Sequence, residues 1–340
     1  MPDFQASIQQ TIPNTMQALA LSEANDAFSL SEMTFPIPQC EPDELLVKIE
    51  YVGLNQLDGM FAKQGFKPRK YPYIVGLDAV GIVVKAAQGL YPNVGERVMW
   101  HANIAQQGVL SEYAKVPNFA VSVVPDNISA QQAASLPCPG MMALICLDKL
   151  HLKEGDTILI EAGAGAIGQF AIQFAKQRGA DVFTTASKCN HKLLKQLGAD
   201  FVFDYKDKKL CNKIKKDLGP MGFDAVLDSV GGEATLRNIE LMRFCGRIAC
   251  LKPLPTLDHD LMYLKAPNIS VVSLGGAWIA KSLCAQQKMS FLGNLLLENL
   301  VENKIKLPQI SEVEFDQKSV TEALHRQLNG GFTGKQIVKI

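Results

Sequence analysis

Apolar and polar positions alternate with two different rhythms along the chain. Between residues 17 and 125, short apolar runs are separated by prolines, asparagines and glycines; the runs lie at 45–54, 74–84, 95–100 and 110–116. This pattern is typical of short strands joined by turns, so it predicts a β-rich module. From about Ser129 the apolar residues recur at helical spacing, with Ser129 as the expected N-cap. The segment from Pro137 to Pro139 is expected to interrupt this helical run.

The middle of the chain alternates strand-like and helix-like segments. The strand patterns lie at 157–162, 181–187, 201–205, 223–230, 247–251 and 269–274, and helical stretches follow the first two at 167–179 and 191–198. This order predicts an α/β fold with a Rossmann-type, doubly wound parallel sheet. Beyond about Trp278, a long helical run and the strand-like segments 313–316 and 335–340 would lack partners unless they return to the first module.

A complete G-x-G-x-x-G motif directly follows the first of these strand patterns and opens a helical stretch. The first glycine permits a tight turn, the second lets backbone approach a pyrophosphate, and the third lets the helix pack closely on the strand. Phosphate would then lie at the positive N-terminus of the helix. The motif predicts a dinucleotide site, and a purely structural glycine turn is the alternative. The residues assigned to this site are Gly163, Gly165, Ala166, Ile167 and Gly168.

The end of the second strand of this unit indicates which coenzyme is bound. An NAD site would be expected to carry Asp or Glu there, about twenty residues past the glycines, to bind the ribose 2′-hydroxyl. The chain has no acid at this position and instead reads Thr-Thr-Ala-Ser-Lys at 184–188. Ser187 can donate a hydrogen bond to a 2′-phosphate, and Lys188 or Lys192 can supply positive charge. We therefore expect NADPH rather than NADH; the alternative is that both lysines are solvated surface charges.

Composition and charge argue against several classes of function. The chain has 340 residues, 47% of them hydrophobic, which is enough for two globular domains. Lys plus Arg and Asp plus Glu both number 34, so no net charge favours a nucleic-acid partner. The eight cysteines form no C-x-x-C pair, and the sequence predicts no membrane span, disulfide framework or zinc knuckle. We expect a cytoplasmic protein with a small-molecule substrate and a short N-terminal extension at residues 1–15.

Several short motifs occur in a characteristic order. They are GLNQLD at 53–58, PYIVGLDAVG at 72–81, VGERV at 94–98, GVLSEY at 108–113, AASLP at 133–137, the glycine motif, LGAD at 197–200, DSVGG at 228–232 and GKQIV at 334–338. Together they resemble the medium-chain dehydrogenase/reductase superfamily, in particular its zinc-independent, quinone oxidoreductase-like members. The resemblance covers about residues 30–340, and it rests on the order and spacing of the motifs.

This resemblance implies the domain arrangement. A GroES-like β-barrel domain would be built from residues 16–128 and 279–340, with the Rossmann domain of residues 129–278 inserted and the active-site cleft between them. Zinc-dependent relatives carry a cysteine ligand in the segment corresponding to 52–55, and a Gly-His-Glu where this chain reads Gly-Leu-Asp at 76–78. Both ligand positions differ, so we expect no zinc site.

The resemblance also implies a reaction, namely hydride transfer from NADPH to a quinone or an α,β-unsaturated carbonyl, with donors that stabilise the developing oxyanion. Asn55 occupies the position that faces nicotinamide and substrate in similar proteins, although an Asn can also simply fix the turn. Tyr51 is a second candidate donor, for which packing in a strand is the alternative. Similar proteins contact the coenzyme at the positions of Tyr205, Gly231, Leu251 and Lys335; Tyr205 would lie beside the adenosine, and Lys335 near a phosphate or the mouth of the active site.

Other polar residues in these motifs have mainly structural interpretations. Asp58 and Asp78 are expected to brace backbone, His101 to be a satisfied hydrogen-bonding residue, and Cys138 to behave as a small buried apolar side chain. Asn190 stands where the family commonly has a lysine of the 2′-phosphate site, so a neighbouring lysine is expected to contact the phosphate.

Two other functions stay open. One is an enoyl-thioester reductase, and the other is an NADPH-binding sensor or structural protein with little turnover. A homodimer is implied by the family, with edge pairing in the nucleotide domain as its expected form.

Overall fold

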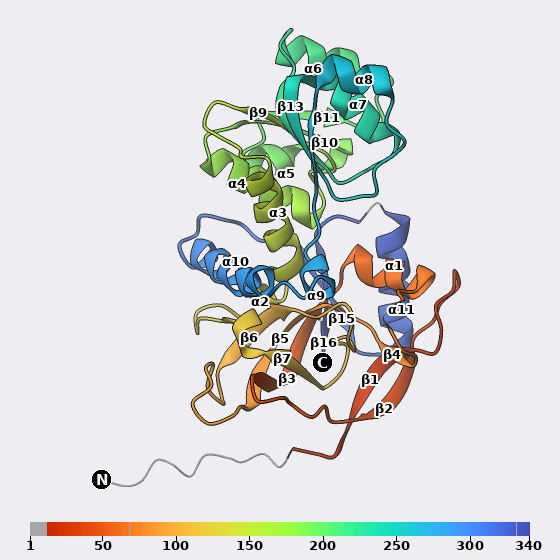
Figure 1. Ribbon diagram of the computed structural model, residues 1–340, viewed down its shortest axis with the longest axis vertical. Coiled ribbons are helices and arrows are strands. Elements are labelled where there is room, and N and C mark those ends of the chain that lie inside the picture. Colours follow the sequence, from red (N-terminus) through yellow and green to blue (C-terminus); the bar gives the residue numbers. More distant parts are fainter. Residues whose placement is uncertain (1–11, 68, 331) are drawn as a thin grey trace.

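The chain folds into two lobes stacked along the long axis of the molecule (Figure 1). The computed structural model describes residues 12–67, 69–330 and 332–340. The first lobe, at the bottom of Figure 1, combines the two ends of the described chain, and the second lobe contains its middle part.

The first lobe is rich in β-structure. Its strands are β1 (Thr15–Leu21), β2 (Ser31–Pro36), β3 (Glu44–Gly53), β4 (Tyr73–Ile74), β5 (Asp78–Lys85), β6 (Arg97–His101), β7 (Tyr113–Pro117), β8 (Ser122–Val123), β15 (Ile310–Glu314) and β16 (Lys335–Lys339). One sheet has the order β15-β16-β3-β5-β6-β8, with β7 also paired to β3, and a three-stranded sheet has the order β2-β1-β4. The helical elements here are α1 (Gln56–Gln64), η1 (Asn118–Ala120) and α11 (Gln317–Asn329).

The C-terminal strand completes the sheet of the first lobe. β16 runs antiparallel to β3, with Val338 opposite Val52 and Ile337 opposite Gly53, and β15 pairs with the other edge of β16. Val338, Ile337 and Val52 are buried, so the last residues of the chain contribute to the core as well as to the ladder. This confirms the prediction that the C-terminal segments return to the first module.

The second lobe contains a parallel sheet of six strands. They are β9 (Thr157–Ile160), β10 (Asp181–Ala186), β11 (Phe201–Asp204), β12 (Phe223–Asp228), β13 (Met242–Cys250) and β14 (Asn268–Val271). Their order, β11-β10-β9-β12-β13-β14, is that of a doubly wound Rossmann sheet, which confirms the predicted fold class. The helical elements between them are α4 (Ala166–Gln177), η2 (Lys188–Asn190), α5 (His191–Gln196), α6 (Leu210–Leu218), α7 (Glu233–Leu241) and α8 (His259–Lys265).

Burial explains the apolar character of these strands. The residues Ile158 to Ile160 of β9 are fully buried, as expected for a central parallel strand covered on both faces. A smaller apolar cluster that includes Leu159, Phe183 and Phe223 packs between the sheet and helices of this lobe, whereas the main core extends through both lobes.

Four helices join the lobes: α2 (Ala130–Ala133), α3 (Pro137–Lys149), α9 (Gly276–Ile279) and α10 (Leu283–Val301). α10 packs against α3 and against β6 and β8 of the first lobe. Ser129 is the N-cap of α2, and its hydroxyl accepts a hydrogen bond from the N–H of Gln132, as predicted. The domain boundaries drawn from the sequence stay predictions.

The expected interruption at Pro137 to Pro139 was placed wrongly. The regular α-helix is interrupted by a tight turn at residues 134–136, and Pro137 and Pro139 lie in the first turn of α3. Proline is tolerated there because the first N–H groups of a helix have no intrahelical acceptor. The prolines therefore start the second helix rather than break the first.

Helix α1 was not predicted within the β-rich module. It follows Asn55 directly and packs against α11. Of the expected N-terminal extension, residues 1–11 lie outside the described part, and β1 already begins at Thr15. Among the residues that the structure describes, no helix is both long enough and apolar enough to cross a bilayer.

Candidate coenzyme and substrate site

The glycine motif forms the turn between β9 and α4. A Cβ atom on Gly163 would lie 2.1 Å from the hydroxyl oxygen of Thr184, and one on Gly168 would lie 2.6 Å from the Cα of Gly163. Both positions therefore require glycine for close packing of the turn against strand and helix. At Gly165 the nearest atom to an added Cβ would be the carbonyl oxygen of Ala162 at 3.4 Å, an ordinary van der Waals contact, so this position is not tightly packed.

The open side of this turn lies at the N-terminus of α4. The first N–H groups of the helix, including those of Ala166 and Ile167, have no intrahelical acceptor and carry partial positive charge. Both residues are half-buried. The side chain of Gln169 braces the turn by donating to the carbonyl oxygen of Ala164 at 2.8 Å. Because Gly165 has no side chain, a ligand can approach the N-terminus of α4 closely. Such a helix N-terminus suits the diphosphate of a dinucleotide.

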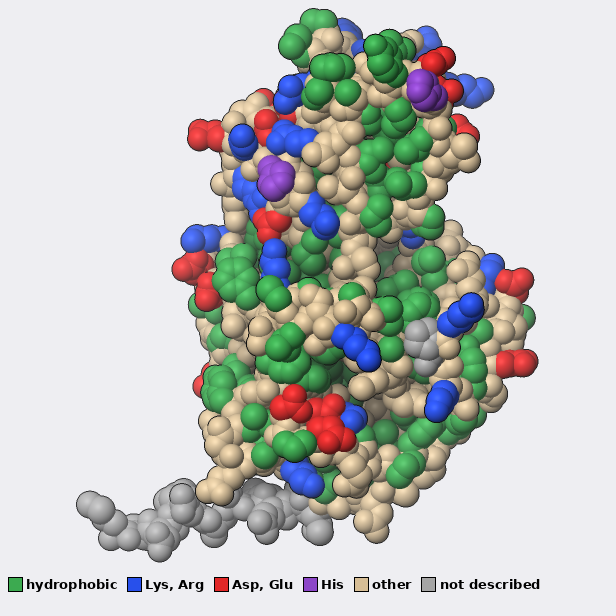
Figure 2. Space-filling model, in the orientation of Figure 1, with side chains coloured by type: hydrophobic (Ala, Val, Ile, Leu, Met, Phe, Trp, Pro, Cys, Tyr) green, Lys and Arg blue, Asp and Glu red, His purple; other side chains and the backbone are tan. Residues whose placement is uncertain are grey.

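The C-terminal segment of the first lobe lies beside this turn. Gly165 forms an isolated parallel bridge with Gly334, the residue before Lys335. The two lobes therefore meet at the glycine motif, and a notch between them is visible on the right of Figure 2, bordered by hydrophobic side chains.

The end of β10 exposes the groups predicted to hold a 2′-phosphate. Lys188 and Lys192 are exposed and form no ion pair with described residues, and Ser187 is half-buried with no hydrogen bond from its hydroxyl to them. Asn190 is turned toward the other lobe, where its side-chain amide donates to the Thr333 hydroxyl at 3.2 Å. Tyr205 is 52% exposed after β11, which leaves a face of its ring accessible.

Beneath the glycine turn lies a buried acid that the sequence reasoning missed. Glu161 is only 2% exposed, accepts a hydrogen bond from the Thr185 hydroxyl and forms an ion pair with Arg237. The Thr185 oxygen in turn accepts from the N–H of Ala162 at 3.2 Å. This network fixes the start of the turn, and a single acid in an otherwise apolar strand was the signal that could have revealed it.

The loops after β12 and β13 lie next along the junction with the first lobe. Gly231 has a φ of 84°, and its N–H donates to the carboxylate of Asp228 at 2.9 Å. The N–H of Leu251 donates to the carbonyl oxygen of Asp228, also at 2.9 Å. Lys252 reaches from this edge to the other lobe, where its ammonium lies 2.6 Å from Oε1 of Gln56. Burial lowers the pKa of Lys252.

A charged cluster lies where α1, β5, β6 and α3 meet. Asp78 and His101 are 0% and 1% exposed, and Nδ1 of His101 lies 2.7 Å from Oδ1 of Asp78. Lys335, also buried, donates to Oδ2 of Asp78 at 3.1 Å and to Oδ1 of Asn55 at 2.7 Å. The structure thus places the predicted coenzyme residue Lys335 next to the predicted catalytic residue Asn55.

Electrostatics favour the ionised form of the Asp78 carboxyl. Burial raises its pKa, but the Lys335 ammonium and hydrogen bonds from His101 and Asn55 outweigh burial and hold the pKa below its ordinary value. Burial and the negative charge of Asp78 raise the pKa of the neighbouring Cys138 thiol. The Nε2 atom of His101 is buried and has no partner among the described residues.

Asp78, His101 and Cys138 offer ligand atoms that all lie within 4.8 Å of one another. The carboxylate, however, already accepts hydrogen bonds from His101, Lys335, Asn55 and the backbone N–H of Cys138. A cation would have to displace the Lys335 ammonium to reach it. The donor set is therefore poorly suited to a divalent metal ion.

The two predicted catalytic donors have different surroundings. Both hydrogens of the Asn55 amide are used, because Nδ2 donates to Oδ2 of Asp78 at 2.9 Å and to the carbonyl oxygen of Gly53 at 3.2 Å. Tyr51 lies half-buried in β3 and makes no side-chain hydrogen bond to a described residue. Donation from either residue to a substrate oxygen stays a prediction, and for Asn55 it would require exchange of one of these bonds.

Comparison with known proteins gives a consistent picture. The family model described as alcohol dehydrogenase GroES-like domain matches residues 41–126, and the one described as zinc-binding dehydrogenase matches residues 166–277. The chloroplastic quinone-oxidoreductase QR1 of Triphysaria versicolor is 29% identical, with 92% of this chain and 94% of that protein covered.

Two further relatives are informative. The trans-enoyl reductase tazE of Aspergillus terreus is 35% identical over 53% of this chain and 67% of its own length. A solved structure of a mycobacterial protein complexed with NADPH superposes with a TM-score of 0.83, at 25% identity, over 96% of this chain and all of that chain.

Proposed function

Because the chain belongs to the medium-chain dehydrogenase/reductase superfamily, as a quinone oxidoreductase-like member, we propose that it is an NADPH-dependent oxidoreductase. Its proposed acceptor is a quinone or an α,β-unsaturated carbonyl, and it works without zinc. The observation that carries this proposal is the contrast among the three glycines, of which only Gly165 leaves room beside the N-terminus of α4.

The described residues suit NADPH. The N–H groups at the start of α4 would hold the diphosphate, Ser187 with Lys188 or Lys192 the 2′-phosphate, and Tyr205 the adenosine face. Gly231 and Leu251 border the cleft along the rest of the coenzyme. When bound, this coenzyme supplies the hydride. The solved mycobacterial relative with NADPH supports the choice of coenzyme.

The chain's own groups have two tasks in this proposal. Lys335, Asp78 and Asn55 form a neutralised, hydrogen-bonded cluster beside the lobe junction. Exchange of one of its two bonds would let the Asn55 amide donate to a substrate oxygen as charge develops there. The ammonium of Lys335 takes the place of a metal as the positive charge next to Asp78. This supports zinc independence, and metal analysis together with activity after chelation tests it: a stoichiometric zinc ion would contradict it.

Coenzyme selectivity provides the direct test. Lys188→Ala should weaken NADPH binding about tenfold or more while leaving NADH binding nearly unchanged, because only NADPH carries the 2′-phosphate. Lys216→Ala, which removes an exposed lysine on α6, is the matched control. Fluorescence titration of the purified protein with both coenzymes measures this. Equal weakening of both coenzymes by Lys188→Ala would remove the argument for NADPH.

An enoyl-thioester reductase is the second candidate, and the similarity to the trans-enoyl reductase of Aspergillus terreus favours it. An acceptor screen that follows NADPH absorbance with quinones, enones, enoyl thioesters and aldehydes separates the two functions. Faster turnover of enoyl thioesters than of quinones would select the second candidate. Tight NADPH binding with no acceptor reduced would instead indicate a sensor or structural protein.

The exposed edge of the parallel sheet and the free cysteines bear on the oligomeric state of the protein and on its cellular compartment. β14 forms one edge of the parallel sheet and carries Val271, which is 58% exposed, so we propose a homodimer that pairs these edges. All eight cysteines are unpaired thiols, which favours a reducing compartment such as the cytoplasm.

A further inference from the structure

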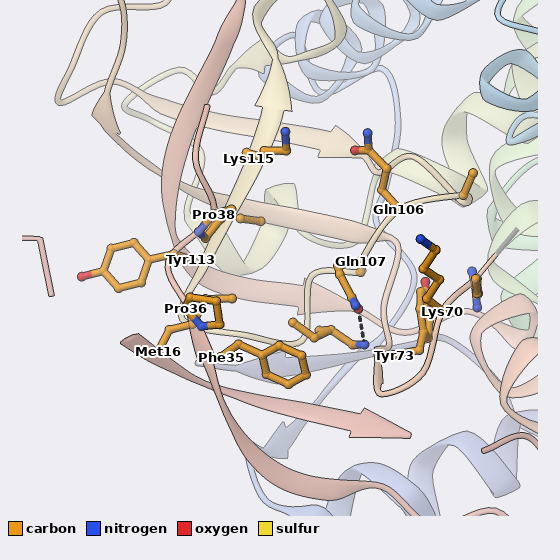
Figure 3. Close-up of a pocket in the computed structure, with 15 residues that line it drawn as sticks. Met16, Phe35, Pro36, Pro38, Lys70, Tyr73, Gln106, Gln107, Tyr113 and Lys115 are labelled. Atoms are coloured by element: carbon orange, nitrogen blue, oxygen red, sulfur yellow. Dashed lines mark hydrogen bonds between the residues drawn. The ribbon is translucent and has the colours of Figure 1, made fainter. Parts of the chain in front are cut away.

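The first lobe contains a cavity that the proposed function does not use. Its volume is about 560 Å³, and it lies between the hairpin of β1 and β2, the segment 105–108 and strand β7. Figure 3 shows Met16, Phe35 and Pro36 on one wall and Lys70 and Tyr73 on the other. None of the residues of the glycine turn or of the charged cluster around Asp78 lines it. A cavity of this size can hold a small organic ligand.

A buried cation lines this cavity. The Arg69 guanidinium is stacked between two aromatic rings, 4.0 Å from the centroid of Phe61 and 3.9 Å from that of Tyr73, and the residue is only 8% exposed. Its Nε donates to the carbonyl oxygen of Ile104 at 3.1 Å, which is the only hydrogen bond from this side chain to a described residue. The rings and this bond hold the planar group in one orientation.

Arg69 has no acidic partner among the described residues. No ion pair with it occurs there, although the buried carboxyl of Asp58 lies close enough to influence its pKa. A cation in such a position costs free energy unless an anion compensates it, and cation–π contacts compensate only part of that cost. The terminal nitrogens of the guanidinium offer the fork of donors that matches a carboxylate.

Two other polar side chains of the wall are already engaged. The Lys115 ammonium pairs with Glu44 at 2.7 Å, and Oε1 of Gln107 accepts from the N–H of Ile74 at 2.7 Å, the bond drawn in Figure 3. Lys70 is exposed and forms no ion pair with described residues, so it adds positive charge on the side of Arg69. The opposite wall is apolar. The cavity therefore combines one cationic end with an apolar body.

We propose that this cavity binds an amphipathic organic carboxylate. The acid group would be held by Arg69, with support from Lys70, and the apolar part would lie against Met16, Phe35 and Pro36. A monoanion matches a single buried cation, whereas a phosphate dianion would need more donors than this wall provides. The site is separate from the proposed coenzyme site, so either proposal can fail without the other.

Isothermal titration with the full chain tests this site in the presence of saturating NADP⁺, which occupies the proposed coenzyme site. Decanoate represents alkyl acids, 2-naphthoate represents aryl acids, and decanol is the uncharged comparison, each below its range of self-association. Saturable binding of at least one acid, at least tenfold tighter than decanol, is expected. The acid that binds more tightly shows whether the cavity prefers a ligand with an alkyl or an aryl apolar part. Absence of saturable binding of both acids, or equal binding of decanol, would overturn the proposal.

Two variants locate the binding. Gln106→Glu adds a carboxylate at an exposed residue of the wall and should weaken acid binding about tenfold, while Gln287→Glu, an exposed residue of α10 outside the cavity, should leave it unchanged. Arg69→Met keeps an apolar side chain between the rings and should weaken binding at least as strongly. If Arg69→Met does not fold, Gln106→Glu still tests whether the acid binds in this cavity. Unchanged binding in Gln106→Glu would place the acid elsewhere and refute the site.

Discussion

Replacing Asp58 with asparagine should remove a pH-dependent loss of stability from the protein. Asp58 lies in the first turn of α1, is 1% exposed, and its Oδ2 accepts from the backbone N–H of Asn55 at 2.8 Å. Its Oδ1 is buried without a partner among the described residues. The asparagine oxygen can keep the bond to Asn55, so the substitution removes the charge while preserving the shape.

The size of the effect follows from the pKa of Asp58. Burial raises it from 3.8 to about 7, despite the hydrogen bond from Asn55. Because the folded state holds this proton more tightly than the unfolded state, the free energy of unfolding falls as the pH rises from about 4 to 7. The full shift corresponds to about 4 kcal/mol, of which roughly 2–3 kcal/mol falls between pH 5 and pH 8.

Urea unfolding at pH 5, 6, 7 and 8 measures how the free energy of unfolding depends on pH. The free energy of unfolding of the wild-type chain should fall by roughly 2–3 kcal/mol relative to that of Asp58→Asn across this range, since other titrating groups affect both proteins equally. Asp217→Asn, at an exposed residue of α6, should show the wild-type profile. Parallel profiles for the wild-type chain and Asp58→Asn would refute the account of this buried carboxyl.

Substitutions at three further places test other parts of the structure. Gly163→Ala should lower the free energy of unfolding in urea by about 1–3 kcal/mol, because its Cβ would collide with Thr184. Gly165→Ala should leave the free energy of unfolding nearly unchanged but weaken NADPH binding about tenfold in a fluorescence titration. A larger loss of stability in Gly165→Ala than in Gly163→Ala would be inconsistent with the glycine geometry. Lys335→Met should lower the free energy of unfolding in urea by about 3–5 kcal/mol, because it leaves the buried Asp78 charge without its ammonium. This loss should be smaller in a double variant that also carries Asp78→Asn. An equal loss in the single and double variants would show that the ion pair is not the cause. Val271→Lys should turn a dimer into a monomer in analytical ultracentrifugation by placing like charges across the proposed edge, and an unchanged dimer would exclude this edge.

The features predicted correctly from the sequence are local ones. Strand β9, the glycine turn and α4 follow one another directly, and each carries its own signal in apolar spacing and glycine positions. The return of β16 to the first lobe was also predictable, because its apolar pattern had no partner elsewhere.

Features that depend on distant residues could not be predicted in the same way. Lys335 meets Asn55 across 280 positions of sequence, so its motif indicated a site but not which end of it. α1 was missed because its glycine, Gly59, weakens the helical signal; in the structure that glycine allows Leu328 of α11 to approach, with 2.9 Å between its Cγ and an added Cβ. Arg69 looks like an ordinary surface charge until the fold places Phe61 and Tyr73 around it.

The late position of β16 has a consequence for biosynthesis. β3 leaves the ribosome long before its antiparallel neighbour at Lys335–Lys339 is translated, whereas every strand of the parallel sheet is made before residue 272. The second lobe can therefore fold first, while β3 of the first lobe still has an unpaired edge. Since β16 also delivers the Lys335 ammonium to Asp78, a chain truncated before Lys335 lacks both the neighbour of β3 and the charge balance of the cluster. Assembly of the charged cluster therefore depends on the pairing of β16 with β3.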